Sequence, residues 1–553
     1  MQLEENKNKI NVWLPLLLSI MMLGGMLVGT KLQPPVQETK IVIENTDGEL
    51  KSIGQGRVEE LIRYIQAKYV DTINADKLVE TAITSLFKDL DPHSVYMSSS
   101  QVKKANEQLE GSFVGIGIEY LLIEDTIVVL NLIEEGPAQK AGIQRGDKII
   151  DANSINSSSD EDDPKEEADL ISQLRGAAGS KVELTILRKG ENGPIKKEII
   201  RNRIVVSSVD VHYMLDEKTG YIKLNKFSAS TLTDFMDALR DLVENHKMEN
   251  LVFDLRQNGG GYLHEAIKVL NQIFHEKDQK LVYTVGKNVK KEEFFSAGRN
   301  IYNINKVCVL IDENSASASE IVAGAIQDWD RGLIIGRRSY GKGLVQEQFD
   351  LKDGSALRLT VARYYTPAGR LIQRDYEEKE EYDSYLKKRI DSGEFTNNDQ
   401  VEISDTSKFY TANGREVYAG GGITPDVYVP YDSLLLNAYY QDLSSSITKF
   451  SFKYIEENDF NLSEEEFISN FRLDDSVVTS LQSFHATDSN NNSNLTDALN
   501  ISVKRAILNE LKARMGKQLY GDLAFYKILH SYDPIISSAL DAQKTYTQLT
   551  EKH

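Results

Sequence analysis

Two segments in the middle of the chain combine residue types that could stabilise a negative charge and attack a carbonyl group. The segment DLRQNGGG at 254–261 and the segment ENSASASEI at 313–321 each directly follow an apolar strand-like run. Consecutive glycines let backbone N–H groups approach a ligand closely, and N–H groups at the start of a helix favour a developing negative charge. One N–H group from each turn would form a two-donor oxyanion hole with a serine at its edge.

Each segment also has a simpler interpretation. Serine is a common helix cap, so 313–321 could do no more than start a helix, and the glycines of 254–261 could form a phosphate loop. Neither segment contains the GxxxxGK[ST] pattern of a nucleotide-binding loop or the GxSxG pattern of an α/β-hydrolase. Capping and catalysis both stay open from these residues alone.

A nucleophilic serine needs a base, and the sequence offers two kinds. Of the eight histidines only His264 lies close to a candidate turn, and a single histidine at such a place is more often structural. The alternative is Lys342, which lies between two glycines in SYGKG at 339–343, after an apolar strand. A lysine acts as a base only where burial lowers its pKa enough to leave the amine neutral. We therefore expect Lys342 to be largely buried.

The composition excludes several other classes of protein. The 553 residues include 84 acidic and 64 basic side chains, for a net charge of -20, and no local basic patch stands out. A protein that neutralises nucleic-acid phosphates is therefore not expected. The single cysteine, Cys308, excludes a disulfide within the chain, a CxxC redox site and a cysteine-based zinc site. We predict neither a metal nor a cofactor.

The N-terminus carries a candidate membrane anchor. The 21 residues between Lys9 and Lys31 are uncharged, a length that matches a hydrocarbon core of about 30 Å. A cleaved signal peptide is the alternative, although no clear small-x-small cleavage site precedes Lys31. Lys7 and Lys9 favour a cytoplasmic N-terminus. We predict a single-pass anchor at 1–31 in the inner (cytoplasmic) membrane, a linker at 32–56, and a body in the periplasm or another extracytoplasmic space.

Hydrophobic periodicity divides the rest of the chain into four regions. Region 57–110 has helical spacing, and 111–205 reads as a small β-barrel-like module with an acidic surface loop at 157–169. Region 206–430 alternates strand and helix signals, which predicts an α/β core, with a polar insertion at 375–416 that we cannot place. Region 431–553 is mainly helical around a low-complexity break at 488–494. Core strands are expected at 220–224, 251–255, 307–311 and 333–335, and core helices at 230–245, 264–274 and 317–329.

Short segments in the same order along 57–430 resemble the C-terminal processing, or tail-specific, serine proteases. Besides the two turns they are LDPHSVYM at 90–97, FVGIGIE at 113–119, AGIQRGDKI at 141–149, YIKLNKF at 221–227, YGKGLVQ at 340–346, YYTPAGRLIQ at 364–373 and GGGITPDV at 420–427. The resemblance implies a multidomain α/β fold: a crotonase-like protease core, an inserted PDZ domain, N-terminal helices and a mainly helical C-terminal tail. It also implies endoproteolysis near protein C-termini, without metal or nucleotide.

The same resemblance assigns the catalytic residues one by one. The nucleophile aligns with Ser317, the middle serine of SASAS, and the base of the Ser–Lys dyad aligns with Lys342. A glutamine that steadies the lysine in some members aligns with Gln346. Asp328 has been considered functional in the family, but it lies about 16 Å along the helix from the nucleophile. We interpret Asp328 as structural.

The oxyanion donors implied by the resemblance are two backbone amides. One belongs to Ala318, directly after the nucleophile, and the other to Gly260 in the first turn. Gly259 is the alternative to Gly260, because the family often has proline at the place of Gly259.

The PDZ-like module supplies the expected substrate recognition. Its carboxylate-binding loop resembles Gly115, Ile116, Gly117 and Ile118. Backbone N–H groups there would capture a terminal carboxylate while the peptide adds as a strand, so the expected partners are proteins with accessible apolar C-termini. Arg175 aligns with an arginine that couples the PDZ domain to the protease in some members. Tails such as 431–553 often pair subunits in this family, which leaves a homodimer as an expectation.

Two other classes compete with the anchored protease. A PDZ scaffold or chaperone would keep the fold without activity, although every proposed catalytic position holds a competent residue. A crotonase-like acyl-CoA enzyme would share the oxyanion hole but would not explain the PDZ-like module. Substrate should persist in a Ser317→Ala variant of a protease and should be unaffected in a scaffold.

Overall fold

The computed structural model describes residues 57–88, 90–123, 126–155, 170–376, 379–401, 405–433, 438–488 and 499–546. The expected anchor at 1–31, the linker at 32–56, the acidic loop at 157–169 and residues 489–494 of the low-complexity break lie outside this range. Within it, none of the helices combines the length and the apolar character that crossing a bilayer requires. The chain divides after Ala82 into two units.

The first unit contains one complete helix and the first part of a second helix. The helix α2 (Arg57–Lys68) has acidic residues in its first turn and Lys68 in its last, which complements the helix dipole. Arg63 also pairs with Glu59 at 2.6 Å, one helical turn away. The helix α3 (Ala75–Phe87) crosses the division between the units, and neither helix has a buried residue.

A six-stranded sheet forms the centre of the second unit. Its strand order is β20-β15-β14-β11-β10-β9, and all pairs are parallel except β10 with β9. The inner strands read as continuous apolar runs, as in VCVLI of β14, because both faces of a parallel sheet are covered. The bounds are β9 (Val209–Met214), β10 (Thr219–Leu224), β11 (Asn250–Asp254), β14 (Val307–Ile311), β15 (Leu333–Gly336) and β20 (Val427–Tyr428).

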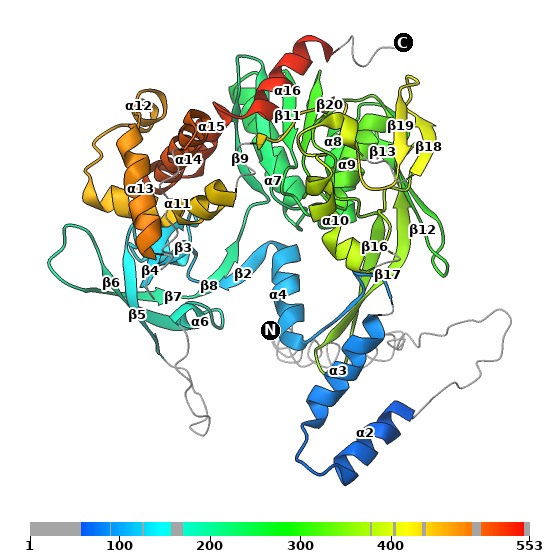
Figure 1. The fold of residues 1–553 in the computed structure, drawn as a ribbon, viewed down its shortest axis with the longest axis horizontal. Helices are drawn as coiled ribbons and strands as arrows, with labels where there is room; N and C mark the ends of the chain where they lie inside the picture. The colour runs from blue at the N-terminus through cyan, green and yellow to red at the C-terminus, as the bar shows by residue number, and fades with distance from the viewer. Residues whose placement is uncertain are drawn as a thin grey trace, which may run out of the picture. The chain divides into compact units, whose positions relative to one another are not determined.

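Side chains alternate between the two faces of this sheet, and each face has its own helices. One face packs Phe253, Val309 and their neighbours against α7 (Thr231–Arg240), α8 (Leu263–Ile273) and α9 (Ala318–Asp328). The opposite face packs against α16 (Pro534–Lys544), shown beside β11 and β20 in Figure 1. The C-terminal tail therefore completes the core. A short π-helix (Asp241–Asn245) extends α7, so the expected helix at 230–245 has a change of winding near its end.

A second sheet carries part of the N-terminal region. Its order is β1-β17-β12-β13, and β16 also pairs with β17. The strand β1 (Val95–Met97) lies within the region expected to be helical, and it pairs antiparallel with β17. After β1, the rest of that region forms the helix α4 (Ser99–Glu110), as expected. The remaining bounds are β12 (Lys277–Val285), β13 (Glu292–Ala297), β16 (Leu344–Asp350) and β17 (Ala356–Tyr365).

The β-module is a five-stranded antiparallel sheet with a separate two-stranded ribbon. The sheet has the order β3-β4-β5-β6-β7, so β3 is an edge strand, and β2 pairs with β8. Two short helices, α5 (Pro137–Lys140) and α6 (Leu170–Gln173), complete it around one buried cluster. The strands are β2 (Ser112–Gly115), β3 (Ile118–Ile123), β4 (Thr126–Leu132), β5 (Lys148–Ile155), β6 (Lys181–Leu187), β7 (Ile195–Ile200) and β8 (Asn202–Val205).

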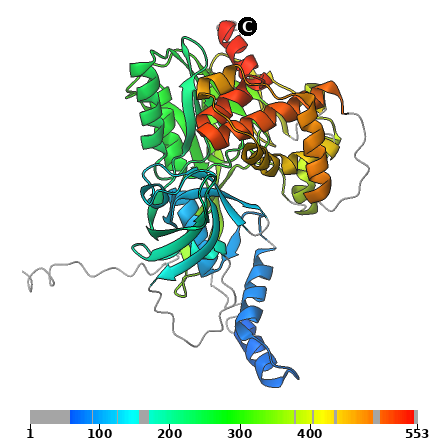
Figure 2. The same ribbon diagram turned by 90° about the vertical axis from the view of Figure 1, so that its left-hand side faces the viewer.

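The insertion and the tail form ordered elements. The insertion contains α10 (Lys379–Asp391), a 3-10 turn (Asn398–Gln400) and the hairpin strands β18 (Asp405–Tyr410) and β19 (Glu416–Ala419). The tail helices in orange to red gather into one bundle around a shared core (Figure 2). They are α11 (Ala438–Glu457), α12 (Glu464–Ser469), α13 (Asp475–Asp488), α14 (Ile501–Tyr520) and α15 (Asp522–His530). The multidomain α/β class with a helical C-terminal region is thus confirmed.

Candidate active site

Three loops meet at one edge of the six-stranded sheet. They follow β11, β14 and β15, which are adjacent and parallel, so their carboxyl ends lie together. Backbone hydrogen bonds join the loops: the Ala316 N–H donates to Asn258 O at 3.0 Å, and the Tyr340 N–H donates to Ser315 O at 3.0 Å. The arrangement brings the glycine turn, the serine turn and the lysine turn to one place.

Ser317 differs in conformation and environment from the serines on either side of it. Its φ of 54° and ψ of -113° form a backbone conformation that non-glycine residues seldom adopt, which marks strain at the mouth of α9. The hydroxyls of the buried Ser315 and Ser319 donate to the backbone oxygens of Leu255 and Asn258. Ser317 is the partly exposed member of the three. Its hydroxyl is therefore the one placed to meet a substrate.

Glu320 ties the serine turn to the lysine turn. This buried carboxylate accepts hydrogen bonds from the backbone N–H groups of Ser317 at 2.8 Å and Lys342 at 2.9 Å. It also accepts from the Gly341 N–H at 2.7 Å and the Ser339 hydroxyl at 2.6 Å. Burial raises the pKa of Glu320 to about 7, although these four donors act in the opposite direction. Glu320 was not predicted from the sequence; its only signal there is the SxxE spacing from Ser317, which is a capping-box pattern.

Tyr364 makes a second connection between the same two backbone positions. Its hydroxyl lies 3.1 Å from Ser317 O and also hydrogen bonds to Lys342 O. The side chain is buried, and burial raises its pKa well above the ordinary value, so the hydroxyl keeps its proton. Ser317 and Lys342 are thus held side by side by two buried side chains that bond to both.

The amine of Lys342 reaches Gln346 of β16, the strand that begins at Leu344 just after the lysine turn. Gly341 has a φ of 86°, and a Cβ atom there would lie 2.9 Å from the backbone of Gly421, so the turn requires glycine. The turn lets Lys342 Nζ donate to Gln346 Oε1 at 3.0 Å. Lys342 is half-buried. Burial, and next the positive charge of Arg358, hold the pKa of its amine below the ordinary value.

The other end of the Gln346 amide binds the N-terminal segment. Its Nε2 donates to the backbone oxygen of His93. The turn around His93 is fixed by Asp91, which accepts from the His93 N–H at 2.9 Å and from the Thr360 hydroxyl at 2.9 Å. Thr360 is the partner of Gln346 in the β16–β17 register. The sequence placed this turn within the LDPHSVYM segment at 90–97 but did not reveal its contact with Gln346.

The expected oxyanion donors, Ala318 and Gly260, lie next to Ser317. A Cβ atom on Gly260, whose φ is 99°, would lie 2.8 Å from Ser317 Cβ and 3.0 Å from Ala318 N, so the glycine permits this approach. However, the Gly260 N–H donates to Asn258 Oδ1 at 2.9 Å. Within the described residues, the N–H groups of Ala318 and Gly259 have no hydrogen-bond acceptor. Gly259 is also exposed, whereas Gly260 is buried.

The proposed carboxylate loop of the β-module is enclosed. Residues 115–117 are buried, Ile116 is in the core of the module, and the backbone of Gly115 bridges to that of Arg175. The Arg175 guanidinium stacks on Phe113 at 5.2 Å and pairs with Glu107 of α4 at 3.0 Å. Arg175 therefore connects the loop to the helix that leads into the module.

The remaining candidates occupy structural positions. His264 contacts the Phe294 ring edge-on, and Asp328 forms a buried ion pair with Arg370. Cys308 is buried within the sheet, and burial raises the pKa of its thiol to about 12. Among the residues that the structure describes, no three His, Cys, Asp or Glu side chains converge as a metal site.

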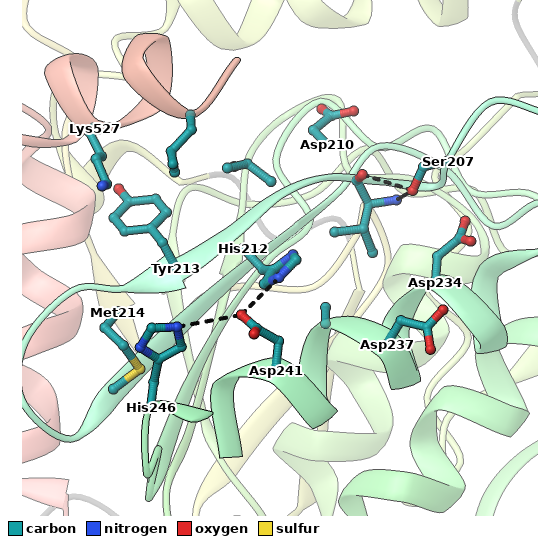
Figure 3. Close-up of a pocket in the computed structure, with 14 residues that line it drawn as sticks. Ser207, Asp210, His212, Tyr213, Met214, Asp234, Asp237, Asp241, His246 and Lys527 are labelled. Carbon is teal, nitrogen blue, oxygen red and sulfur yellow. Dashed lines mark hydrogen bonds and ion pairs between the residues drawn. The ribbon is translucent and has the colours of Figure 1, made fainter. Parts of the chain in front are cut away.

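A cavity of about 760 Å³ lies away from these loops, between β9, α7 and α15. In Figure 3 the rings of His212 and His246 approach the carboxylate of Asp241 from two sides. Their Nε2 atoms lie 3.3 and 3.6 Å from its Oδ2. The cavity lining includes neither Ser317 nor Lys342, so it is separate from the candidate active site.

Comparison with known proteins covers most of the chain. Peptidase family S41 matches residues 218–379, the PDZ domain matches 114–196, and the activating protease CtpB N-terminal domain matches 20–101. The carboxy-terminal-processing protease of Bartonella bacilliformis is 36% identical over 344 residues, which are 61% of this chain and 76% of that protein. The carboxy-terminal processing protease CtpB of Bacillus subtilis is 34% identical over 323 residues, 58% of this chain and 65% of that protein. The solved photosystem II D1 C-terminal processing protease is 24% identical, with a TM-score of 0.35, over 68% of this chain and 93% of that one.

Proposed function

The chain belongs to the carboxy-terminal processing proteases of peptidase family S41, and from this premise we propose that Ser317 and Lys342 form its catalytic dyad. As a member of this family the chain is a serine-type peptidase, and it also has a PDZ domain. The observation that carries the proposal is the double connection of the two residues through Glu320 and Tyr364. Glu320 and Tyr364 each bond to the backbones of both residues, so together they hold the serine turn and the lysine turn in one register.

The proposed reaction follows from the chemistry of a neutral amine that acts as the base for a serine hydroxyl. The neutral Lys342 amine removes the proton of the Ser317 hydroxyl as its oxygen attacks the peptide carbonyl carbon. The resulting ammonium passes a proton to the leaving amine, and an acyl-enzyme remains. Water then attacks the ester and gives a proton to the lysine, which passes a proton to the Ser317 oxygen as the ester bond breaks, so that the carboxylic acid leaves and the serine hydroxyl and the neutral amine are restored. Gln346 Oε1 accepts from Nζ throughout and keeps the amine aimed.

The developing oxyanion needs two N–H donors, and we propose that Ala318 supplies the first. The glycine turn supplies the second. Gly260 is the second donor if its N–H group leaves Asn258 Oδ1 and donates to the oxyanion instead. The N–H group of the exposed Gly259 has no such bond to give up. A Gly259→Pro variant separates the two, because proline has no N–H group. Unchanged kcat assigns the role to Gly260, and a loss of about 10²-fold or more assigns it to Gly259.

Substrates are proposed to be proteins with accessible apolar C-termini. The edge strand β3 directly follows the loop at 115–118, so a peptide could add to β3 while its carboxylate enters the loop. Because the Gly115–Arg175 bridge closes the loop here, peptide entry requires Arg175 to move. We propose that its pair with Glu107 reports this movement to the protease core.

We also propose an extracytoplasmic enzyme held in the cytoplasmic membrane by residues 1–31. The uncharged stretch between Lys9 and Lys31 supports the anchor, and the basic residues before it support a cytoplasmic N-terminus. Membrane fractionation and protection from added protease test both points, with a chain lacking 1–31 as the control. A homodimer stays a prediction that light scattering of the full chain checks.

The dyad is tested with two variants and one substrate pair. Ser317→Ala and Lys342→Met should each lower kcat/KM by at least about 10³-fold on an unfolded protein with an apolar C-terminus. The same substrate with an amidated C-terminus should have a higher KM for the parent enzyme. Full activity of Lys342→Met would disprove the dyad. An equal KM for both substrates would disprove recognition of the C-terminal carboxylate.

A further inference from the structure

The helix of the insertion lies directly against the turn that carries Lys342. Arg389 of α10 donates to Arg338 O at 2.8 Å and to Ser339 O at 3.2 Å. Arg338 and Arg389 both pair with the buried Glu394, at 2.6 and 2.8 Å. The match to peptidase family S41 ends at residue 379, where α10 begins. The helix therefore lies beyond the matched residues and is bonded to the backbone just before the proposed base.

A chain of hydroxyl groups runs from this helix toward the dyad. Arg374 donates to the Tyr340 hydroxyl at 2.8 Å, which lies 3.3 Å from the Tyr382 hydroxyl of α10. The Tyr382 hydroxyl in turn lies 2.7 Å from His93 Nε2. Because an arginine can only donate, the Tyr340 oxygen accepts from Arg374, and its own O–H group can donate to the Tyr382 oxygen. The Tyr382 O–H group can then donate to His93 Nε2 when the neutral ring carries its proton on Nδ1.

His93 transmits this contact to the proposed catalytic amine. Its backbone oxygen accepts from Gln346 Nε2. A carbonyl can only accept, so it holds the amide with Oε1 facing Lys342 Nζ. The ring of His93 stays neutral, because burial and then the positive charge of Lys342 lower its pKa to about 4. The T-shaped packing of the ring on Tyr382, at 5.6 Å between centroids, fixes its orientation.

We propose that Tyr382 is a positioning residue for catalysis: through the ring of His93, its hydroxyl holds the backbone oxygen that keeps Gln346 Oε1 on the Lys342 amine. The inference rests on the proposed Ser–Lys dyad. Tyr382 touches neither Ser317 nor Lys342, so it acts on the reaction only through His93 and Gln346. The insertion is thereby a support for the active site of this chain.

A pH profile separates positioning from simple stability. Gln346 Oε1 stabilises the charged form of Lys342, so a Gln346 amide that is free to turn over lowers the pKa of the amine. Tyr382→Phe removes one hydroxyl and keeps the ring that stacks on Arg374 at 3.8 Å. Its rising limb of kcat/KM against pH should move to lower pH while the plateau falls, by about tenfold for a loosened general base. The other charged groups that act on Lys342, namely Arg358, Glu320 and Asp91, are unchanged.

Tyr385→Phe is the matched control on the same helix. Tyr385 also stacks on Arg374, at 4.6 Å, but its hydroxyl accepts from Arg338 and does not contact His93. Its pH limb should stay at the position of the parent enzyme. Tyr340→Phe interrupts the same hydroxyl chain one step earlier and should shift the limb in the same direction as Tyr382→Phe, by less.

Each possible result supports or overturns the positioning role of Tyr382. The inference is overturned if the rising limbs of kcat/KM against pH coincide for Tyr382→Phe, Tyr385→Phe and the parent enzyme. It is also overturned if Tyr382→Phe loses activity while its limb stays where it is in the parent enzyme. If Tyr382→Phe fails to fold, the limb of Tyr340→Phe decides alone. Lys342→Met serves as the reference: if it stays active, the dyad itself is wrong, whereas an inactive Lys342→Met with coincident tyrosine limbs refutes only the role of Tyr382.

Discussion

The proposed chemistry depends on a few single residues. Those that could be predicted from the sequence are the ones with unusual neighbours in the chain. Ser317 and Lys342 stand out because small or flexible residues surround them and an apolar strand precedes each turn. Glu320 and Tyr364 do not stand out, since a capping glutamate and a strand tyrosine are common. Their roles depend on hydrogen bonds to residues distant in sequence, which neither periodicity nor spacing reveals. The strained backbone of Ser317 was equally invisible.

Glu320→Gln should impair both catalysis and stability. The amide NH₂ group would replace one carboxylate oxygen and face N–H donors, which leaves buried donors unpaired at about 1–3 kcal/mol each. We expect kcat to fall at least tenfold with a smaller change in KM. Steady-state kinetics on an unfolded protein substrate measure it. Parent-like kcat would show that the backbone bonds of Ser317 and Lys342 do not depend on this carboxylate.

The stability effect of the same variant should depend on pH with a defined sign. The folded-state pKa of Glu320 is about 7, above its ordinary 4.5. Between these values the folded state holds the extra proton, so this group's contribution to the free energy of unfolding falls as pH rises, by up to about 1.4 kcal/mol per unit. The destabilisation of Glu320→Gln relative to the parent should therefore shrink from pH 5 to pH 7. Urea unfolding in a Ser317→Ala background, which prevents self-digestion, checks this; a constant difference would contradict the pKa.

Gln346→Glu should move the catalytic pH limb in the opposite direction to Tyr382→Phe. The pKa of Lys342 lies below the ordinary 10.5 because of burial and Arg358, so the parent limb should lie below that pH. A carboxylate 3.0 Å from the amine would stabilise the ammonium and raise its pKa by about 1–3 units. The kcat/KM limb should shift upward accordingly, and an unmoved limb would show that Lys342 is not the titrating base.

At the scale of elements, long apolar or periodic segments could be predicted and short ones could not. The sequence predicts strands at 251–255 and 307–311, and the structure has β11 and β14 there, because five consecutive buried positions leave a strong pattern. The three residues of β1 leave none, and only pairing with β17 makes them a strand. The insertion could not be placed from the sequence either, since α10 is tied to the core by the buried ion pairs of Arg389 and Arg338 with Glu394, which no sequence pattern reveals.

The helix α16 should be essential to the core although it is near the end of the chain. Ile536 is 3% exposed and packs with Leu310 and Ile335 of the central sheet. Ile536→Ala should lower the free energy of unfolding by about 2–5 kcal/mol, because the residual cavity adds to the lost transfer energy. Ile501→Ala on α14, where the side chain is 73% exposed, is the control and should change little. Equal urea midpoints for both variants would show that the packing of α16 on the sheet does not stabilise the core.

At the scale of the whole molecule, the tail at 431–553 also contacts the PDZ domain. These contacts are polar, and no sequence pattern predicts them. Lys517 of α14 pairs with Glu119 of β3 at 2.8 Å, and Lys148 of β5 pairs with Glu456 of α11 at 2.7 Å. Partly exposed pairs of this kind are worth at most about 1 kcal/mol each and weaken with salt. The tail therefore holds the proposed peptide-binding strand by a contact that ionic strength can loosen.

Chemical cross-linking tests this contact, because the chain offers a clean background. Cys308 is buried and its thiol pKa is raised to about 12, so it should not react. Asn131 of β4 donates to Asp522 at the start of α15 at 3.2 Å. In a Ser317→Ala chain, the pair Asn131→Cys and Asp522→Cys should be joined by a short bismaleimide at low salt, and several-fold less at 0.5 M NaCl, where the Debye length is only about 4 Å.

The matched control moves one cysteine to the far end of α14. Ile501 is exposed and lies about 28 Å along the helix from Tyr520, so Asn131→Cys with Ile501→Cys exceeds the reach of the reagent. Equal cross-linking of both pairs would mean that the tail and the PDZ domain are not held in this arrangement. If cross-linking of the first pair does not depend on salt, the contact would instead rest on the packing of Lys148 over Phe452, whose ring centroid lies 5.4 Å from the Lys148 Nζ, and not on the ion pairs.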